Sequence, residues 1–168
     1  MPGRDLEHEV GITLREAYEG TTRYVTKGDR RLKVNIPAGA DNGTKVRLTG
    51  EGEPGQGGPG DLYLIVRVDA DPQFEREGDN LYVDVEVDMF TAMLGGDIRV
   101  PTLARAVKVK IPPGTQSGQK LRVSGKGMPR LRTKDQYGDL FARVMITVPR
   151  NLTTIQRELV EQLRSSLE

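Results

Sequence analysis

Cysteine and tryptophan are absent from this sequence of 168 residues, and histidine occurs once, as His8. A chain without cysteine forms no disulfide and offers no thiolate nucleophile, and a single histidine cannot complete a zinc site. Such a chain suits a reducing compartment. No apolar run approaches the roughly 20 residues that cross a bilayer, and no secretory signal is visible. We therefore expect a cytoplasmic protein without membrane contact, metal or cofactor.

Neither sign of charge is in excess, because 25 Lys and Arg residues balance 24 Asp and Glu residues and leave a net charge of +1. A chain without a global positive field is not favoured as a nucleic-acid binder. Basic residues do cluster in two segments, at Lys27, Arg30, Arg31 and Lys33 and at Arg130, Arg132 and Lys134. Weak DNA binding therefore stays open as an alternative, and it would fall steeply with added salt.

Patterns that could indicate an enzyme have simpler explanations. Asp84, Glu86 and Asp88 alternate with apolar residues, as the water-facing side of a strand does. Residues 50–55 match the dinucleotide fingerprint G-x-G-x-x-G, but a Gly- and Pro-rich loop follows where that site needs a helix. His8 lies in an alternating segment, where a solvated or half-buried histidine is the expected case. We expect no catalytic residues and no enzyme.

The chain contains an internal repeat, since residues 5–52 reappear at 80–127 with an offset of 75. Matched pairs include Leu6 and Leu81, Val10 and Val85, Ala17 and Ala92, Gly20 and Gly95, Val34 and Val109, and Gly50 and Gly125. A later Gly-Asp-Leu match, at 60–62 and 138–140, has an offset of 78, so a loop in the second copy has gained three residues. Duplication at this period predicts two small domains, at 5–75 and 76–152.

Most of each copy alternates between apolar and polar residues with a period of two, as in Leu81, Val83, Val85 and Val87. Turns rich in Pro and Gly separate these runs. We predict a mainly β fold of two tandem small β-sandwiches. Residues 14–20 and 89–95 each predict a short helical turn that ends at a glycine.

The C-terminal segment, 153–168, predicts an amphipathic helix. Thr153 and Gln156 have the spacing of a capping box. Apolar residues form one stripe, at Ile155, Leu159, Val160, Leu163 and Leu167. A helix of about 15 residues is marginal alone in water, so the stripe must pack on its own sandwich or on a second chain.

Several motifs stand in the order of a known family. They are Val10–Gly20, Leu32–Gly39, Gly50–Gly52 and Gly60–Tyr63 in the first copy, and Val109–Gly114, Gly125–Pro129 and Gly138–Leu140 in the second. In these motifs the chain, from Asp5 to Leu167, closely resembles the C-terminal substrate-binding region of DnaJ-type J-domain co-chaperones. It lacks the J-domain, the Gly/Phe-rich linker and the cysteine zinc module, and so is similar to the zinc-free class, such as curved-DNA-binding protein A.

The resemblance implies a co-chaperone that captures unfolded client polypeptides by β-strand addition and presents them to the 70-kDa heat-shock chaperone. Without a J-domain, this chain should hold clients without stimulating the partner ATPase. The family's groove lies in the first β-domain, between its opening strand and the next one. Carried over by position, Ile12, Leu14, Val25 and Leu64 would line a pocket, and Arg23 and Tyr24 would follow the receiving edge. From the residues alone, the favoured interpretation is that Ile12, Leu14 and Leu64 are ordinary core residues.

The resemblance also implies two further contacts. Arg23 and Lys27 occupy the region where the family meets the acidic C-terminal tail of the 70-kDa chaperone. The C-terminal helix pairs two protomers in the family, which assigns Ile155, Leu159, Leu163 and Leu167 to a homodimer interface. A dimerising spacer with no ligand of its own is the remaining alternative.

Overall fold

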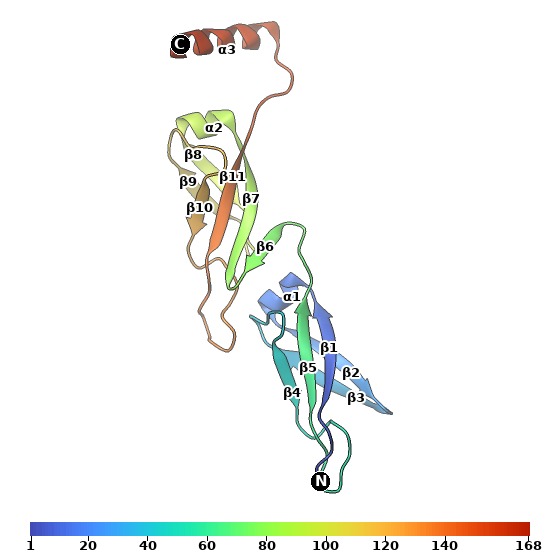
Figure 1. The fold of residues 1–168 in the computed structure, drawn as a ribbon. Helices are drawn as coiled ribbons and strands as arrows, with labels where there is room; N and C mark the ends of the chain where they lie inside the picture. The colour runs from blue at the N-terminus through green and yellow to red at the C-terminus, as the bar shows by residue number, and fades with distance from the viewer.

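The computed structural model describes residues 1–168. The first copy comprises β1 (Leu6–Ile12), α1 (Leu14–Glu19), β2 (Thr21–Lys27), β3 (Arg30–Ile36), β4 (Lys45–Leu48) and β5 (Leu62–Val68). The second comprises β6 (Phe74–Glu77), β7 (Asn80–Asp88), α2 (Met89–Leu94), β8 (Gly96–Val100), β9 (Val107–Ile111), β10 (Lys120–Val123) and β11 (Leu140–Thr147), and α3 (Thr154–Leu167) follows. The molecule is elongated, with the first copy at one end and α3 at the other (Figure 1). No helix is both long and apolar enough to cross a membrane.

The two copies share one topology. In the first, a sheet of order β1-β5-β4 accompanies the β2-β3 hairpin, and in the second a sheet of order β10-β11-β7-β6 accompanies the β8-β9 hairpin. The opening and closing strands of each copy, β1 with β5 and β7 with β11, pair in parallel, with Leu6 opposite Leu62 and Leu81 opposite Leu140. The predicted fold class, mainly β with two tandem sandwich-like domains and a C-terminal helix, is confirmed.

The repeated Gly-Asp-Leu motif fastens a turn in each copy. The Asp61 carboxylate accepts hydrogen bonds from the Gly50 N–H, at 2.8 Å, and from Arg47 Nε, also at 2.8 Å. Asp139 accepts the same two bonds from Gly125 and Arg122, at 2.9 and 2.8 Å. The glycine N–H and the guanidinium hold the pKa of both carboxyls below the usual range. The aspartate of the motif therefore has the same role in each copy, since it accepts a hydrogen bond from the glycine N–H of the turn.

Both short helices form where the repeat predicts them. Thr13 caps α1 and forms a reciprocal capping box with Glu16. Asp88 caps α2 by accepting a hydrogen bond from the Thr91 N–H. Each helix ends at a glycine in the left-handed region, Gly20 at φ +81° and Gly95 at φ +80°, a conformation that favours glycine.

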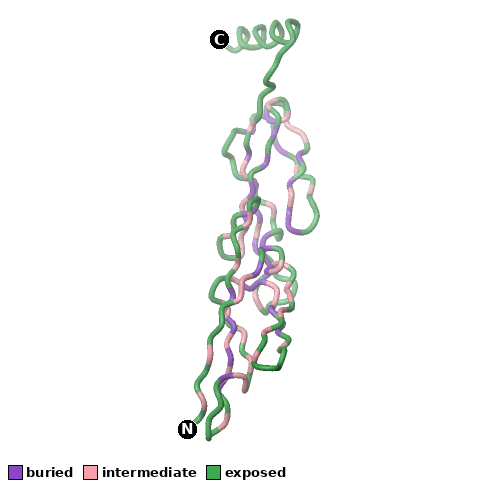
Figure 2. Tube along the Cα trace, turned by 90° about the vertical axis from the view of Figure 1, so that its right-hand side faces the viewer, coloured by how far each residue is buried: buried purple, intermediate pink, exposed green.

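The junction between the copies is packed. The predicted domain boundary, between residues 75 and 76, falls inside β6, which pairs with β7. The Arg76 guanidinium reaches back to the first copy and donates to the carbonyls of Ala40, at 2.6 Å, and Gly39, at 3.2 Å. From the other side, Arg15 donates to the Leu103 carbonyl at 2.7 Å. One cluster of 20 buried residues contains members of both copies, and buried residues run through both in Figure 2.

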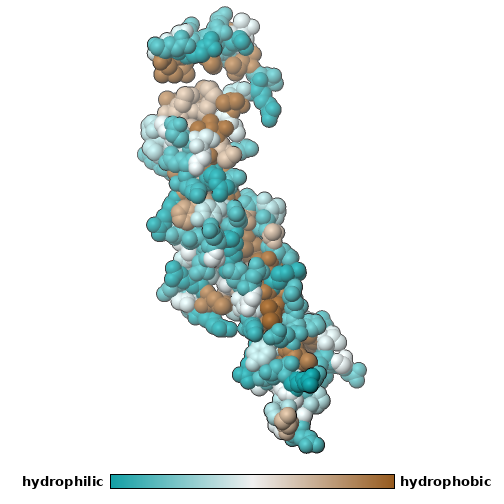
Figure 3. Space-filling model, in the orientation of Figure 1, coloured by the Kyte–Doolittle hydropathy of each residue, from teal (hydrophilic) through white to brown (hydrophobic).

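α3 begins as predicted, with Thr153 and Gln156 forming a capping box. No residue of α3 is buried, and the helix stands apart from the sandwiches (Figures 1 and 2). Its apolar side chains face the apolar surface of α2 (Figure 3). The stripe is thus not buried against its own sandwich.

Candidate functional site

The opening strands of the two copies differ in how well they are covered. The inward-facing residues of β7, Leu81, Val83, Val85 and Val87, are at most 7% exposed. Their equivalents in β1 are Leu6, His8, Val10 and Ile12. Only Ile12 is buried, whereas Leu6 and Val10 are half-buried and His8 is exposed. The first sandwich is therefore open along most of its opening strand.

Strand β6 accounts for much of this difference. It pairs antiparallel with the outer edge of β7, where Phe74 lies opposite Val83 and is 4% exposed. Met128 is fully buried in the second copy, while the first copy has the exposed Glu53 at the equivalent position. Within the described chain, β1 pairs only with β5, so its outer edge carries no neighbouring strand.

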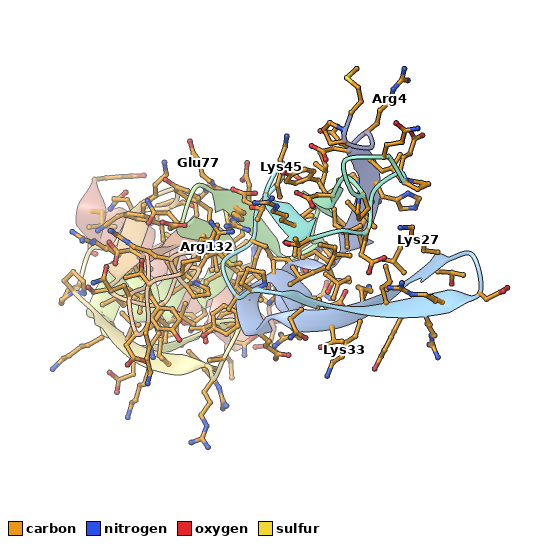
Figure 4. The ribbon with its side chains drawn as sticks, turned by 90° about the horizontal axis from the view of Figure 1, so that it is seen from below. Arg4, Lys27, Lys33, Lys45, Glu77 and Arg132 are labelled. Carbon is orange, nitrogen blue, oxygen red and sulfur yellow. The ribbon has the colours of Figure 1, made fainter.

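Strand β2 provides a second free edge, because it pairs only with β3. Its residues alternate between half-buried and exposed, and Arg23, Val25 and Lys27 are the half-buried set. Lys27 lies on the side of the hairpin that faces the rest of the domain, and Lys33 projects from the opposite side (Figure 4). Two free strand edges and a partly uncovered apolar interior thus occur together in the first copy.

The predicted pocket residues fall into two groups. Ile12, Leu14 and Leu64 are at most 3% exposed and belong to the core. Val25 is half-buried and lies opposite Leu32. The apolar side chains that reach the surface of this region therefore include Val10 and Leu32, which the resemblance did not identify. A comparison of mismatched positions between the copies, such as His8 against Val83, would have pointed to the uncovered strand β1 that contains Val10.

Tyr24 lies on the outer face of the β2-β3 hairpin, away from Val25. Its ring is exposed, and the Arg31 guanidinium stacks over it at 4.4 Å from the ring centroid. Arg31 and Lys33 form no ion pair. The structure does not bring Tyr24 together with the predicted pocket.

Both cations predicted to meet an acidic tail already have partners. Arg23 binds the Glu16 carboxylate through two nitrogens, at 2.6 and 2.7 Å. The Arg23 guanidinium, together with the Thr13 N–H, lowers the pKa of Glu16 to about 2. Lys27 Nζ lies 3.4 Å from Glu51 and donates to the Gly52 carbonyl at 3.0 Å. A ligand carboxylate at either cation would have to compete with an internal one.

No three His, Cys, Asp or Glu side chains gather where they could hold a metal ion, and every buried side-chain polar atom has a hydrogen-bond partner. The features that distinguish the first copy are the unpaired edge of β1 and the half-buried apolar side chains beside it.

A separate apolar surface lies at the C-terminal end. Between α2 and α3 lies an open pocket of about 400 Å³, lined by Met89, Phe90, Pro149, Leu152, Leu159, Val160 and Leu163, with Asn151 and Gln156. Ile155 and Leu167, also predicted as interface residues, are exposed on α3. The apolar surface therefore extends beyond α3 and includes residues of α2.

Comparison with known proteins identifies the family to which the chain belongs. The family model for the DnaJ C terminal domain matches residues 6–149, so the chain belongs to that family. "Chaperone protein DnaJ" of Hyphomonas neptunium is 49% identical over 139 residues, which cover 81% of this chain and 36% of that protein. The proteins of the same name from Azorhizobium caulinodans and Chelativorans sp. are 48% and 50% identical over 137 residues, or 80% of this chain and 36% of each relative.

The chain therefore spans about 36% of the length of these curated relatives. Within the first copy, β2 and β3 are joined by only two residues, Gly28 and Asp29.

Proposed function

We propose that this chain is the peptide-binding region of a co-chaperone, which captures unfolded or hydrophobic polypeptide segments by β-strand addition to the first domain. The observation that carries the proposal is the contrast between the copies. The opening strand of the second copy is covered by β6 and Phe74, whereas β1 in the first copy has an unpaired edge beside half-buried Val10. The β2 edge, which carries half-buried Val25, is unpaired as its equivalent β8 is in the second copy. Membership of the DnaJ C terminal domain family supports it.

Strand addition suits a binder of unfolded chains. Backbone hydrogen bonds between an edge strand and an extended segment do not depend on the sequence of that segment. The half-buried apolar side chains then favour segments that bring aliphatic or aromatic groups. Covering them removes apolar area from water at about 25 cal/mol per Å². Core residues Ile12, Leu14 and Leu64 form the floor beneath this surface.

The 70-kDa heat-shock chaperone is the proposed recipient of the client. Its acidic C-terminal tail would bind at Arg23 and Lys27, by exchange with the carboxylates of Glu16 and Glu51. Arg30, which also binds Glu51, would assist because it becomes available when Glu51 moves. Exchange of one carboxylate for another conserves charge pairing, so this contact should be weak and reversible.

A homodimer through α3 completes the proposal. The stripe of Ile155, Leu159, Leu163 and Leu167 is exposed in one chain, and an open pocket between α2 and α3 lies beside it. A second copy would cover this apolar surface. Two first domains on one dimer could then hold two segments of the same client and raise the effective concentration of the second contact.

The proposal is tested by removing surface apolar side chains from the first domain. Val10→Ser with Val25→Ser should weaken capture of a denatured client about tenfold, because one decade corresponds to about 1.4 kcal/mol. Val107→Ser with Val109→Ser is the matched control, since these residues are also half-buried but lie in the second domain. Suppression of client aggregation is measured after circular dichroism shows that all variants are folded. Equal loss from both pairs, or loss from neither, would contradict the proposal.

A further inference from the structure

Only five residues, 69–73, connect the last strand of the first copy to β6. Two domains joined in this way move relative to each other by default, unless a large packed interface opposes the motion. The loop 128–138, between β10 and β11, extends from the second copy toward the first (Figure 1). We propose that this interdomain loop fixes the two domains in one orientation, so that the chain is a rigid arm.

The interdomain loop is the place where the second copy departs from the repeat, since the three added residues lie here. Its base is anchored in the second domain. Met128 is fully buried, and its N–H donates to the Asp79 carbonyl at 2.8 Å. Further along, the Arg130 N–H donates to the Gln136 carbonyl at 2.8 Å, which ties the two sides of the loop together. The loop is therefore a stiff projection.

The tip of the interdomain loop has an unusual backbone. Arg132 and Asp135, at φ 58° and 60°, are the only residues of the chain other than glycine with a left-handed φ. Such a conformation costs free energy and persists only where the surrounding structure imposes it. Both strained residues occur in the one loop that reaches the other domain, so the strain points to a constraint that acts on this loop.

The interdomain loop lies against the turn that follows β3. A β-carbon at Gly39 would lie 2.6 Å from the Pro129 carbonyl oxygen and 2.8 Å from the Leu131 nitrogen. The equivalent glycine of the second copy, Gly114, has a similar conformation, with φ +81° against +92°, but no atom lies within 4 Å of a β-carbon there. The contact between the two backbones therefore requires glycine at position 39, in addition to the turn itself.

An aromatic pair extends the contact to α1. The ring of Tyr137, near the end of the interdomain loop, lies 6.2 Å from that of Tyr18, centroid to centroid, with 46° between the planes. Tilted pairs at this distance are favourable. Arg15 lies three residues before Tyr18, on the same side of α1, and donates to the Leu103 carbonyl at 2.7 Å. Two segments of the second domain thus hold one face of α1.

Arg76, in β6, provides a third attachment. Its guanidinium donates to the carbonyls of Ala40 and Gly39, and its side chain is only 9% exposed. Withdrawal of a hydrogen-bonded guanidinium from two buried carbonyls would leave polar groups unsatisfied. The three attachments come from different segments of the second domain. Rotation about bonds of the linker therefore cannot reorient the domains without breaking at least one attachment.

A fixed orientation has a consequence for the assembly. The first domain and α3 lie at opposite ends of the chain (Figure 1). In the proposed dimer, two rigid arms would hold the two first domains at a fixed separation, and this separation sets the effective concentration of the second contact on one client. This consequence rests on the proposed function, whereas the rigid junction does not.

Residual dipolar couplings of backbone amides, measured on the weakly aligned protein, report the relative orientation of the domains. Couplings from β1–β5 and from β6–β11 should fit one alignment tensor. Gly39→Ala should abolish the common fit, because the added methyl group displaces the Pro129 carbonyl. Gly114→Ala is the matched control, since it introduces the same backbone strain without the contact, and it should keep one tensor. Amide chemical shifts within each domain show whether both variants are folded.

Tyr137→Ser removes the aromatic contact without backbone strain and should also separate the tensors, whereas Tyr63→Ser, in β5, should not. It decides the question if Gly39→Ala does not fold. Separate tensors in the unmodified protein or in Gly114→Ala, or one common tensor in a folded Gly39→Ala or Tyr137→Ser variant, would overturn the proposal. Capture of a short unfolded segment should be the same in Gly39→Ala as in the unmodified protein, so failure of the rigid junction is distinguished from failure of the proposed function.

Discussion

The two copies of the repeat share one fold and differ mainly in whether the opening strand is covered by another strand. Both contain a parallel pair formed by the opening and closing strands, a short capped helix and a two-stranded hairpin. In the second copy β6 covers the opening strand and Phe74 enters the core, while in the first the equivalent edge is bare and His8 faces water. In the second copy, β6, a strand of four residues, thus covers the edge that the opening strand of the first copy leaves unpaired.

The largest expected effect concerns α3, which neither copy covers. Leu159→Asp with Leu163→Asp places two charges in the apolar surface shared with α2, and burial of unpaired carboxylates is strongly unfavourable. We expect the proposed dimer to dissociate completely. Light scattering at tens of micromolar should show the mass of one chain for the variant and of two for the unmodified protein. Arg157→Ala, on the charged side of α3, should leave the mass unchanged, and a single-chain mass for the unmodified protein would refute the dimer.

The closure of the second copy depends on Phe74. Phe74→Ala should lower the free energy of unfolding by about 3–5 kcal/mol, because it leaves a cavity where a buried ring was packed. Met145→Ala is a suitable control, since Met145 is exposed on the same domain. Urea denaturation of both variants measures the difference. An effect below about 1 kcal/mol would show that the second copy does not need this anchor.

Glu16 gives the first copy a pH dependence of its own. Its folded-state pKa of about 2 lies below the ordinary 4.5, so its stabilising effect is fully present above pH 4.5 and is lost as the pH falls toward 2. Glu16→Gln should reduce stability at pH 7 by about 1–3 kcal/mol, through loss of charge-assisted hydrogen bonds to Arg23. Urea unfolding between pH 6 and 2 should show a shallower decline for the variant. Parallel curves for both proteins would contradict this role.

The smallest expected effect is at the cations of β2. Lys27→Gln should weaken binding of a peptide with an acidic C-terminus about fivefold, since an exposed ion pair contributes up to about 1 kcal/mol. Lys33→Gln, on the opposite side of the hairpin, should have no effect. Fluorescence anisotropy at low and high salt is the measurement, and affinity should fall with salt in the unmodified protein. Equal affinities of the two variants would remove Lys27 from the tail site.

Much of the fold could be predicted because the repeat makes each strand visible twice. Alternation identified β7 and β11, and glycines at 20 and 95 marked the ends of both short helices. The parallel pairing of β1 with β5 could not be predicted, since it joins segments about 56 residues apart in the sequence. β6 was not predicted, because its four residues look like a linker in the sequence. They form a strand by pairing with β7.

The location of the candidate site stays a prediction, and the structure adds details that the sequence pattern could not supply. Alternation places Ile12, Leu14 and Leu64 on the inner face, yet it cannot distinguish the covered end of a sandwich from the open end. The differences between the copies, His8 for Val83 and Glu53 for Met128, were present in the sequence. These differences could be interpreted only once β6 was known. β6 covers the strand that contains Val83, whereas the strand that contains His8 is left uncovered.

Hydrogen exchange of the chain with and without an unfolded client tests the central claim most directly. The account predicts new protection at amides of β1 and β2 in the first domain, with no change at the equivalent strands β7 and β8 of the second. Protection that rises equally in both domains, or only in the second, would contradict the claim that the open first copy is the binding domain.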